Sequence, residues 1–230
     1  MLLFLLGCLV SGEIGKDSID FHIDRVDLQQ CHSVSESSHE SSVRIAFMNE
    51  EESIGHGSGN YFKLGKHRFI LTAAHVALSE YDLKVVDGEG LVELTLVYTD
   101  IERDIAIMVP KEKLSSIRAH RWKVNDSSNM VGKMVNYTGY PSHLPKVLIR
   151  GMVSAHNDYG FLMQSFALPG SSGSVVFDSR GRVLGVVSAV MLNHSGLSPF
   201  PNLEENMVYV SGADYMDNEF IKEVLKCGGK

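Results

Sequence analysis

From residue 43 onward, hydrophobic residues come in short runs rich in Val, Ile, Leu, Phe, Tyr and Thr, and Gly, Asn, Asp and Pro separate one run from the next. Short β-prone runs with regular turn residues between them are typical of a sandwich or a barrel. The pattern therefore predicts an all-β fold, with strands near 43–48, 60–64, 68–72, 83–86, 91–99, 104–109, 131–137, 147–155, 160–166, 174–177, 182–190 and 207–211.

The end of the chain carries the one clear helical pattern, over 215–226. Asp214 stands near its start and two glycines follow it, as expected at helix ends. Between the predicted strands there are no runs of about 10–15 residues with a helical period, which argues against a parallel α/β sheet. The hydrophobic residues of this predicted helix fall on one side: Phe220, Ile221, Val224 and Leu225.

The first ten residues, Met1 to Val10, are almost wholly apolar. They are too few to cross a bilayer as a helix, which takes about 20 residues. They resemble the apolar part of a secretion signal, with Val10 and Gly12 as small residues before a cut, and Leu5 to Cys8 resembles a bacterial lipoprotein box with Cys8 as the lipid-bearing residue. Because no Lys or Arg precedes the run, a mis-assigned start or a first strand remains an alternative. We expect 1–12 to be the leader of an exported protein.

A polar segment follows this leader over 13–42. Its last part, 31–42, reads CHSVSESSHESS and has the composition of a linker or a mobile leader. The folded domain is therefore predicted to begin at about residue 43.

Composition and charge narrow the class of partner. The chain has 230 residues, of which 44% are hydrophobic and 21% charged, as in ordinary folded soluble proteins. The formal net charge is −7. Nucleic acids and anionic membranes both favour a basic face, so this balance argues against either as a partner. A membrane is expected to be reached only through a lipid on the N-terminus or an uncleaved leader.

The three cysteines, Cys8, Cys31 and Cys227, have no spacing that suggests zinc or a redox pair. If Cys8 is removed or lipidated, Cys31 and Cys227 can pair and tie the two ends of the domain together, while two unpaired thiols are the alternative. No metal and no cofactor is predicted.

The stretch Gly170 to Ser174, GSSGS, can be a flexible linker or a tight turn that presents a nucleophilic serine. A reactive serine needs a base, a group that orients the base, and N–H donors for the developing oxyanion. Of ten histidines, only His75 directly follows an apolar strand through small residues, in FILTAAHV. Asp104 begins the apolar strand DIAIMV, where an unpaired carboxylate would be costly to bury. These two residues are the candidate base and its orienting acid.

His75, Asp104 and Ser172 follow one another in the order His, Asp, Ser. The surrounding segments TAAH, RDIAIM and GSSGS resemble the signatures of trypsin-like serine proteases of chymotrypsin fold. The resemblance covers about 43–212 and is nearest to the cystine-poor branch that includes the HtrA proteases. Segments GSG at 57–59, GYP at 139–141, GMVS at 151–154 and GRVLGVVS at 181–188 are also typical of it. An α/β-hydrolase is excluded, because its chain order is Ser, acid, His and its elbow is G-x-S-x-G.

The resemblance implies a fold of two six-stranded antiparallel β-barrels, with the catalytic residues in the cleft between them. The protease domain would occupy 43–212, and the C-terminal helix in 213–230 would pack on it. After residue 212 there is no room for the PDZ domain of HtrA proteases.

Roles carry over by position. Ser172 would be the nucleophile, His75 the general base and then the acid, and Asp104 the residue that orients His75 and stabilises its imidazolium. The N–H groups of Gly170 and Ser172 would form the oxyanion hole. Ser188 matches the serine that lies beside the triad aspartate.

The substrate pocket of this family is walled by the segment before the nucleophile and by the strand after it. Here those walls are Phe166 and Ala167 on one side and Ser188, Ala189 and Val190 on the other. No acid stands at Phe166, so a preference for Lys or Arg is not expected. Because the Val190 side chain would narrow the pocket, we expect cleavage after small or medium apolar residues.

Two positions depart from the family pattern. Ser171 stands where secreted digestive proteases have an aspartate that pairs with a newly cut N-terminus, so activation through that charge pair is not expected. Ser174 replaces a common glycine, which the fold should tolerate.

The function predicted from these residues is a serine endopeptidase that hydrolyses protein or peptide substrates through an acyl-enzyme. The alternatives are a protein of protease fold that binds peptides or partners without cleaving them, a self-processing viral protease, and a non-protease esterase. Because the His, Asp and Ser are all present, the endopeptidase is favoured.

Overall fold

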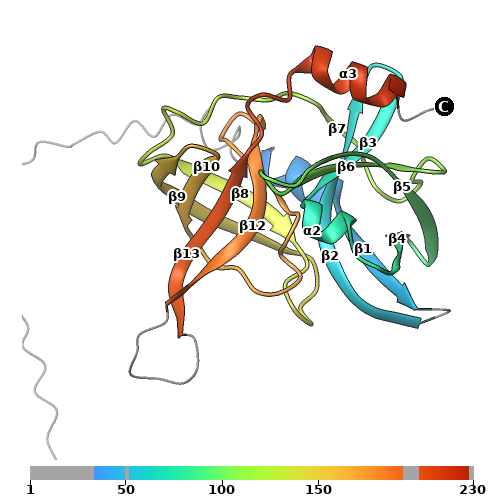
Figure 1. Ribbon diagram of the computed structural model, residues 1–230, viewed down its shortest axis with the longest axis horizontal. Coiled ribbons are helices and arrows are strands. Elements are labelled where there is room, and N and C mark those ends of the chain that lie inside the picture. Colours follow the sequence, from blue (N-terminus) through green and yellow to red (C-terminus); the bar gives the residue numbers. More distant parts are fainter. Residues whose placement is uncertain (1–33, 50–51, 194–201, 228–230) are drawn as a thin grey trace, which may run out of the picture.

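The computed structural model describes residues 34–49, 52–193 and 202–227, and Figure 1 shows them as two β-barrels side by side. The predicted all-β fold with two six-stranded antiparallel barrels and a C-terminal helix is confirmed. The predicted leader over 1–12 and residues 13–33 of the polar segment lie outside the described residues.

The first barrel contains β1 to β6. Its strands are hydrogen-bonded in the order β1-β4-β5-β6-β3-β2, and pairing of β1 with β2 closes the ring. A two-residue strand, β7, pairs in parallel with β2 outside this ring. The strands are β1 (Ser42–Asn49), β2 (Glu52–Leu64), β3 (His67–Thr72), β4 (Asp82–Asp87), β5 (Gly90–Asp100), β6 (Ile105–Pro110) and β7 (His120–Arg121).

The second barrel is closed in the order β10-β13-β12-β11-β8-β9. Its strands show why the sequence pattern worked: in β9, buried and exposed residues alternate along much of the strand, as a sheet with one face on a core requires. The strands are β8 (Met134–Gly139), β9 (Val147–Asn157), β10 (Gly160–Gln164), β11 (Val175–Phe177), β12 (Val183–Asn193) and β13 (Asn202–Gly212).

Two helices of the described chain relate to the predicted elements: α2 contains His75, and α3 is the predicted C-terminal helix. The short α2 (Ala74–Ala77) follows β3 directly and lies between the barrels in Figure 1. The α3 helix (Asn218–Cys227) packs on the first barrel, with Ile221 and Leu225 buried. It begins after Asp217 rather than near Asp214, because Asp217 Oδ1 accepts the N–H groups of Glu219 (3.0 Å) and Phe220 (2.8 Å).

Residues 34–41, which the composition predicts as part of a polar segment, are helical. Ser38 and Ser41 in this turn are buried, and the Asn60 amide of β2 donates to the Ser38 carbonyl (3.2 Å) and to Ser41 Oγ (2.9 Å). Ser38 Oγ also lies 3.1 Å from Thr138 Oγ1 in β8, so this turn is hydrogen-bonded to both barrels.

Cys227 is exposed and makes no disulfide within the described residues. Cys8 and Cys31 lie outside them, so a Cys31–Cys227 pair stays a prediction. In the part of the chain that the structure describes, no helix is long and apolar enough to cross a membrane.

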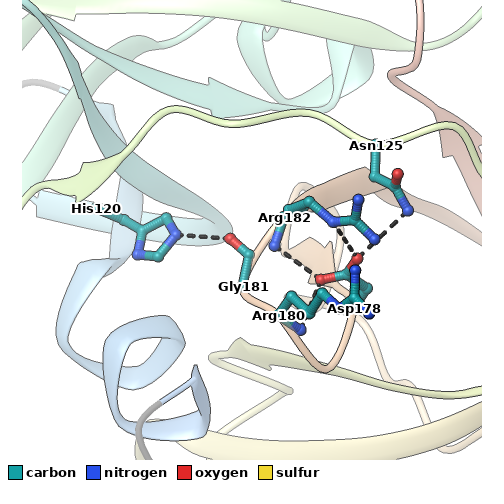
Figure 2. Close-up of polar contacts among 6 residues, drawn as sticks. All are labelled: His120, Asn125, Asp178, Arg180, Gly181 and Arg182. Atoms are coloured by element: carbon teal, nitrogen blue, oxygen red, sulfur yellow. Dashed lines mark hydrogen bonds and ion pairs between the residues drawn. The ribbon is translucent and has the colours of Figure 1, made fainter. Parts of the chain in front are cut away.

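A buried carboxylate, Asp178, joins the turn before β12 to the segment after β7, because the Asn125 amide donates to Asp178 Oδ2 at 3.3 Å (Figure 2). Asp178 accepts the backbone N–H groups of Arg180 (2.8 Å) and Arg182 (2.9 Å), and Arg182 Nε lies 2.7 Å from its other oxygen (Figure 2). Nearby, His120 of β7 donates from Nε2 to the Gly181 carbonyl at 2.9 Å (Figure 2). The turn 178–182 is thereby fixed against the first barrel.

We expect His120 to make the fold acid-sensitive. Burial lowers the pKa of His120, and the Lys63 charge adds to this, although the bond to Gly181 acts the other way. With a folded pKa below the ordinary 6.5, the unfolded chain binds more protons, so stability is complete above pH 6.5 and falls as the pH drops below it. The free energy of unfolding should lose at most about 1.4 kcal/mol per pH unit through this residue. Urea unfolding between pH 8 and pH 5 should show a shallower loss for His120→Gln; an equal loss would contradict the assignment.

Candidate active site

His75 and Asp104 are joined by two hydrogen bonds. His75 Nδ1 donates to Asp104 Oδ2 at 2.8 Å, and the His75 backbone N–H donates to Asp104 Oδ1 at 2.8 Å. Ala73 and Ala74 are buried between the end of β3 and His75, which lets neighbouring segments approach closely. The His75 side chain itself is 50% exposed, so its other ring nitrogen is free to face a substrate.

Asp104 stands in the turn before β6 in a left-handed conformation, with φ 53°. The Ser188 hydroxyl of β12 donates to the same Oδ2 that holds His75. Burial acts to raise the pKa of the Asp104 carboxyl, but the hydrogen bonds from His75 and Ser188 outweigh it, and the pKa lies below its ordinary value. Asp104 is therefore an anion that fixes the proton of His75 on Nδ1.

The GSSGS stretch is a fixed turn. The Ser58 N–H of β2 donates to the Ser172 carbonyl (2.8 Å), and the Gly173 N–H donates to the Val187 carbonyl (2.8 Å). Gly173 has φ +89°, and a Cβ there would lie 2.0 Å from the Ser58 carbonyl oxygen. Only glycine fits at this position.

The same turn lies beside the His75–Asp104 pair. The Val187 carbonyl accepts the Gly173 N–H, and the hydroxyl of the next residue, Ser188, donates to Asp104. On the other side, a Cβ at Gly57 would meet the Val76 methyls at 2.8 Å and the Ser172 carbonyl oxygen at 3.4 Å. The residue after His75 and the backbone of Ser172 thus meet across Gly57.

The described residues show no hydrogen bond between the His75 imidazole and the Ser172 hydroxyl. Such bonds are often long in a site without substrate and shorten when it binds. Of the three residues that the sequence singles out, the structure joins His75 to Asp104 and places the backbone of Ser172 close to Gly57.

Two backbone N–H groups of the turn are available. Within the described chain, the Gly170 and Ser172 N–H groups donate to no carbonyl or side chain. Ser142 N–H donates to the Pro169 carbonyl at 2.5 Å. In a trans peptide the C=O and N–H point in opposite directions, so this bond turns the Gly170 N–H away from Ser142.

Residues 57–186 match the family model of the trypsin-like peptidase domain, which is more than half of the chain. The chain belongs to the trypsin-like peptidase family. It is 28% identical over 158 residues to a "Probable periplasmic serine endoprotease DegP-like" from Halomonas elongata and to one from Pseudomonas putida. The match covers 64% of this chain and 31% of either relative, so the chain spans about a third of their length.

The solved structures agree on the fold. A serine endoprotease from Yersinia pestis superimposes with a TM-score of 0.65 at 17% identity, over 86% of this chain and 67% of that one. The resemblance to the HtrA protease domain is confirmed at the level of family and fold.

Ser171, the other serine of this trypsin-like turn, is not exposed to solvent. It is buried, and its Oγ accepts the Leu168 N–H at 3.3 Å. At the position of the zymogen aspartate, this hydroxyl therefore stabilises the turn itself. Ser174 is also buried, and a Cβ at Gly139 would lie 2.1 Å from its Oγ, so the added side chain is accommodated opposite a glycine.

The sequence did not identify three residues that support the site. Ser58 Oγ donates to the Gly170 carbonyl (2.7 Å) and accepts the Tyr140 N–H (2.9 Å). His56 Nε2 lies 2.8 Å from the Tyr140 carbonyl and 2.8 Å from where a Gly170 Cβ would be. Ser142, which donates its N–H to the Pro169 carbonyl, has a left-handed backbone conformation with φ 52°. The one sequence signal was the GSG segment at 57–59, which marks the strand but not these contacts.

The predicted substrate residues lie on the two segments that the family pattern names. Phe166 is 45% exposed, and its carbonyl accepts the Tyr137 hydroxyl. Ala167 is partly buried and packs against the second barrel's core. Ser188, Ala189 and Val190 lie in β12, where Val190 pairs with Val208 of β13. The Val190 side chain lies outside the described residues, so its effect on the pocket stays a prediction.

Proposed function

We propose that this chain is a serine endopeptidase in which Ser172 is the nucleophile, His75 the general base and Asp104 the residue that orients it. The observation that carries the proposal is the hydrogen-bonded array of His75, Asp104 and Ser188 beside a turn whose Gly170 and Ser172 N–H groups donate to no group within the described residues. This is the arrangement that acyl transfer by serine requires.

In the proposed reaction, Ser172 Oγ attacks the carbonyl carbon of the scissile bond while His75 Nε2 takes its proton. The Gly170 and Ser172 N–H groups bind the oxyanion of the tetrahedral intermediate. His75 then gives the proton to the departing amine, which leaves an acyl-enzyme ester on Ser172. Water, deprotonated by His75, hydrolyses that ester and restores the serine.

Protein or peptide chains are the proposed substrates. We propose that they bind as an added strand along 188–190, by main-chain hydrogen bonds. Because the relatives are named as periplasmic endoproteases, we also propose that this protein is exported.

A fluorophosphonate probe tests the proposal, because it forms a covalent bond only with an activated serine. At about pH 8, where a neutral imidazole can act as base, we expect one adduct per chain and tandem mass spectrometry to place it on Ser172. The Ser171→Ala variant should keep most of the labelling, since that hydroxyl is buried. An adduct on Ser171, or no adduct on a folded chain, would refute the nucleophile assignment.

The proposed preference for small or medium apolar residues depends on Val190. Replacing it with glycine should enlarge the pocket and raise kcat/KM for Phe or Leu before the cut by about tenfold. Cleavage profiling of the wild type and of Val190→Gly on the same peptide library measures this directly. An unchanged profile in Val190→Gly would mean that another residue limits the pocket.

A further inference from the structure

Three cations stand next to one another across three strands of the first barrel. Lys63 of β2 is directly opposite Arg68 of β3 and beside Arg121 of β7. Like charges at opposite positions destabilise a sheet, so the fold gains nothing from this row. Lys63 and Arg121 are exposed and Arg68 partly so, and within the described residues none of the three makes an ion pair.

Two adjoining hollows flank Lys63. One has a volume of about 230 Å³, and its lining includes Lys63, Arg118, His120 and Arg121 together with one acidic residue, Glu40. The other, of about 240 Å³, is lined by Arg68, Lys113 and Arg118 as well as Lys63. Since Lys63 and Arg118 line both, the hollows form one basic surface on a protein whose net charge is −7.

The nearby acids do not neutralise this surface. Glu40 makes an exposed pair with Arg118 (3.1 Å), a type of contact that contributes little. Asp87 accepts N–H and O–H groups from Ser115 and Ser116 and makes no ion pair with any of these cations within the described residues. Five cations therefore face solvent around the two hollows with few anions among them.

We propose that Lys63, Arg68, Arg118 and Arg121 form a docking site for an acidic segment of another polypeptide, with carboxylates held in both hollows. Guanidinium groups bind carboxylates through paired hydrogen bonds. Strands lie about 4.8 Å apart, so Arg68 and Arg121 stand about 10 Å from each other, and alternate side chains of an extended peptide lie about 7 Å apart. Acidic residues at alternate positions of an extended segment can thus reach both hollows.

The net charge favours a short acidic peptide over a nucleic acid. A long polyanion would extend past the two hollows onto a protein surface that is negative overall. A segment with a few carboxylates engages only the local cations, whose field is screened beyond about 8 Å.

This site is distant from the candidate active site. Arg68 is at the start of β3 and Thr72 at its end, about 13 Å along the strand, and His75 follows Thr72. A bound acidic segment would leave the cleft open. If the chain is a peptidase, the site would hold part of a substrate while another part is cleaved; that use rests on the proposed function, whereas the binding itself does not.

Fluorescence anisotropy with fluorescein-labelled hexaglutamate tests the site on the Ser172→Ala chain, which removes any effect of cleavage. We expect saturable binding that weakens as salt rises, and a Kd about tenfold higher for Lys63→Ala/Arg121→Ala. The matched control Lys133→Ala/Arg150→Ala removes two exposed cations from the second barrel and should change Kd less than twofold. The test variant should melt at the same temperature or higher, because the like-charge contacts are gone.

Several outcomes would overturn the proposal. They are an absence of saturable binding, an equal loss in both double variants, and displacement of hexaglutamate by far lower concentrations of tripolyphosphate or single-stranded DNA. The last result would assign the surface to phosphate. If Ser172→Ala binds hexaglutamate but fluorophosphonate does not label the wild-type chain, the docking site is sustained while the proposed peptidase activity fails.

Discussion

Replacing Ser172 with alanine is expected to lower kcat on a peptide substrate by about 10⁶-fold, because the acyl-enzyme can no longer form. The Ser172 side chain makes no hydrogen bond within the described residues and is only partly buried, so alanine leaves no buried polar group unpaired. The melting temperature should stay within about 2 °C of the wild type. Single-turnover assays with an ester and a peptide substrate measure the loss.

Ser171→Ala is the matched control for this variant. It removes a buried hydroxyl that accepts the Leu168 N–H, so it should cost about 1 kcal/mol of stability and less than tenfold in kcat. If Ser171→Ala lost activity as completely as Ser172→Ala while both remained folded, the roles of the two serines would have to be revised.

Replacing Asp104 with asparagine should lower kcat by about 10⁴-fold with little change in the fold. An amide cannot hold both His75 N–H groups as the carboxylate does, and an amide nitrogen facing Nδ1 would favour the tautomer with the proton on Nε2. That tautomer cannot take a proton from serine. Asparagine tolerates the left-handed backbone at this position, so φ 53° is not a source of strain.

The Ser188→Ala variant tests whether Asp104 acts through its negative charge or through its full set of hydrogen bonds. It removes one of the three hydrogen bonds to the carboxylate but leaves the anion in place, so kcat should fall about tenfold or less. Because the pKa of Asp104 is already below its ordinary value, the wild type should keep this group ionised throughout the range from pH 5 to pH 9. A kcat loss in Asp104→Asn no larger than that in Ser188→Ala would contradict the orienting role.

Strands such as β9 were predictable because one face of the strand is buried, and burial of one face imposes alternation on the sequence. Elements that depend on partners elsewhere were not. The β7 strand has two residues, and its partner is the edge of β2. Residues 34–41 form a helical turn whose serines are hydrogen-bonded to Asn60 and Thr138. A serine-rich segment has the same composition whether those partners are present or not.

The candidate site likewise contains residues that the sequence identifies and residues that depend on distant partners. His75, Asp104 and Ser172 stand in short segments whose residue types reflect local needs: small residues before the histidine and glycines around the serine. Ser58 and Ser142 act through contacts with Gly170 and Pro169, which are far away in sequence. The sequence also did not predict that Arg68 and Arg121 lie beside Lys63, because this depends on the register of β2 with β3 and β7.

The helical turn at 34–41 belongs to the folded part of the protein, although its composition resembles that of a linker. Its Ser38 and Ser41 are the partners of the fully buried Asn60 amide, and Ser38 is also hydrogen-bonded to Thr138 of the other barrel. A cut after residue 42 would leave these interior groups unpaired, at about 1–3 kcal/mol each, and would remove a connection between the halves that form the cleft. Deleting residues 34–41 is therefore expected to weaken both the interior around Asn60 and the contact between the two barrels.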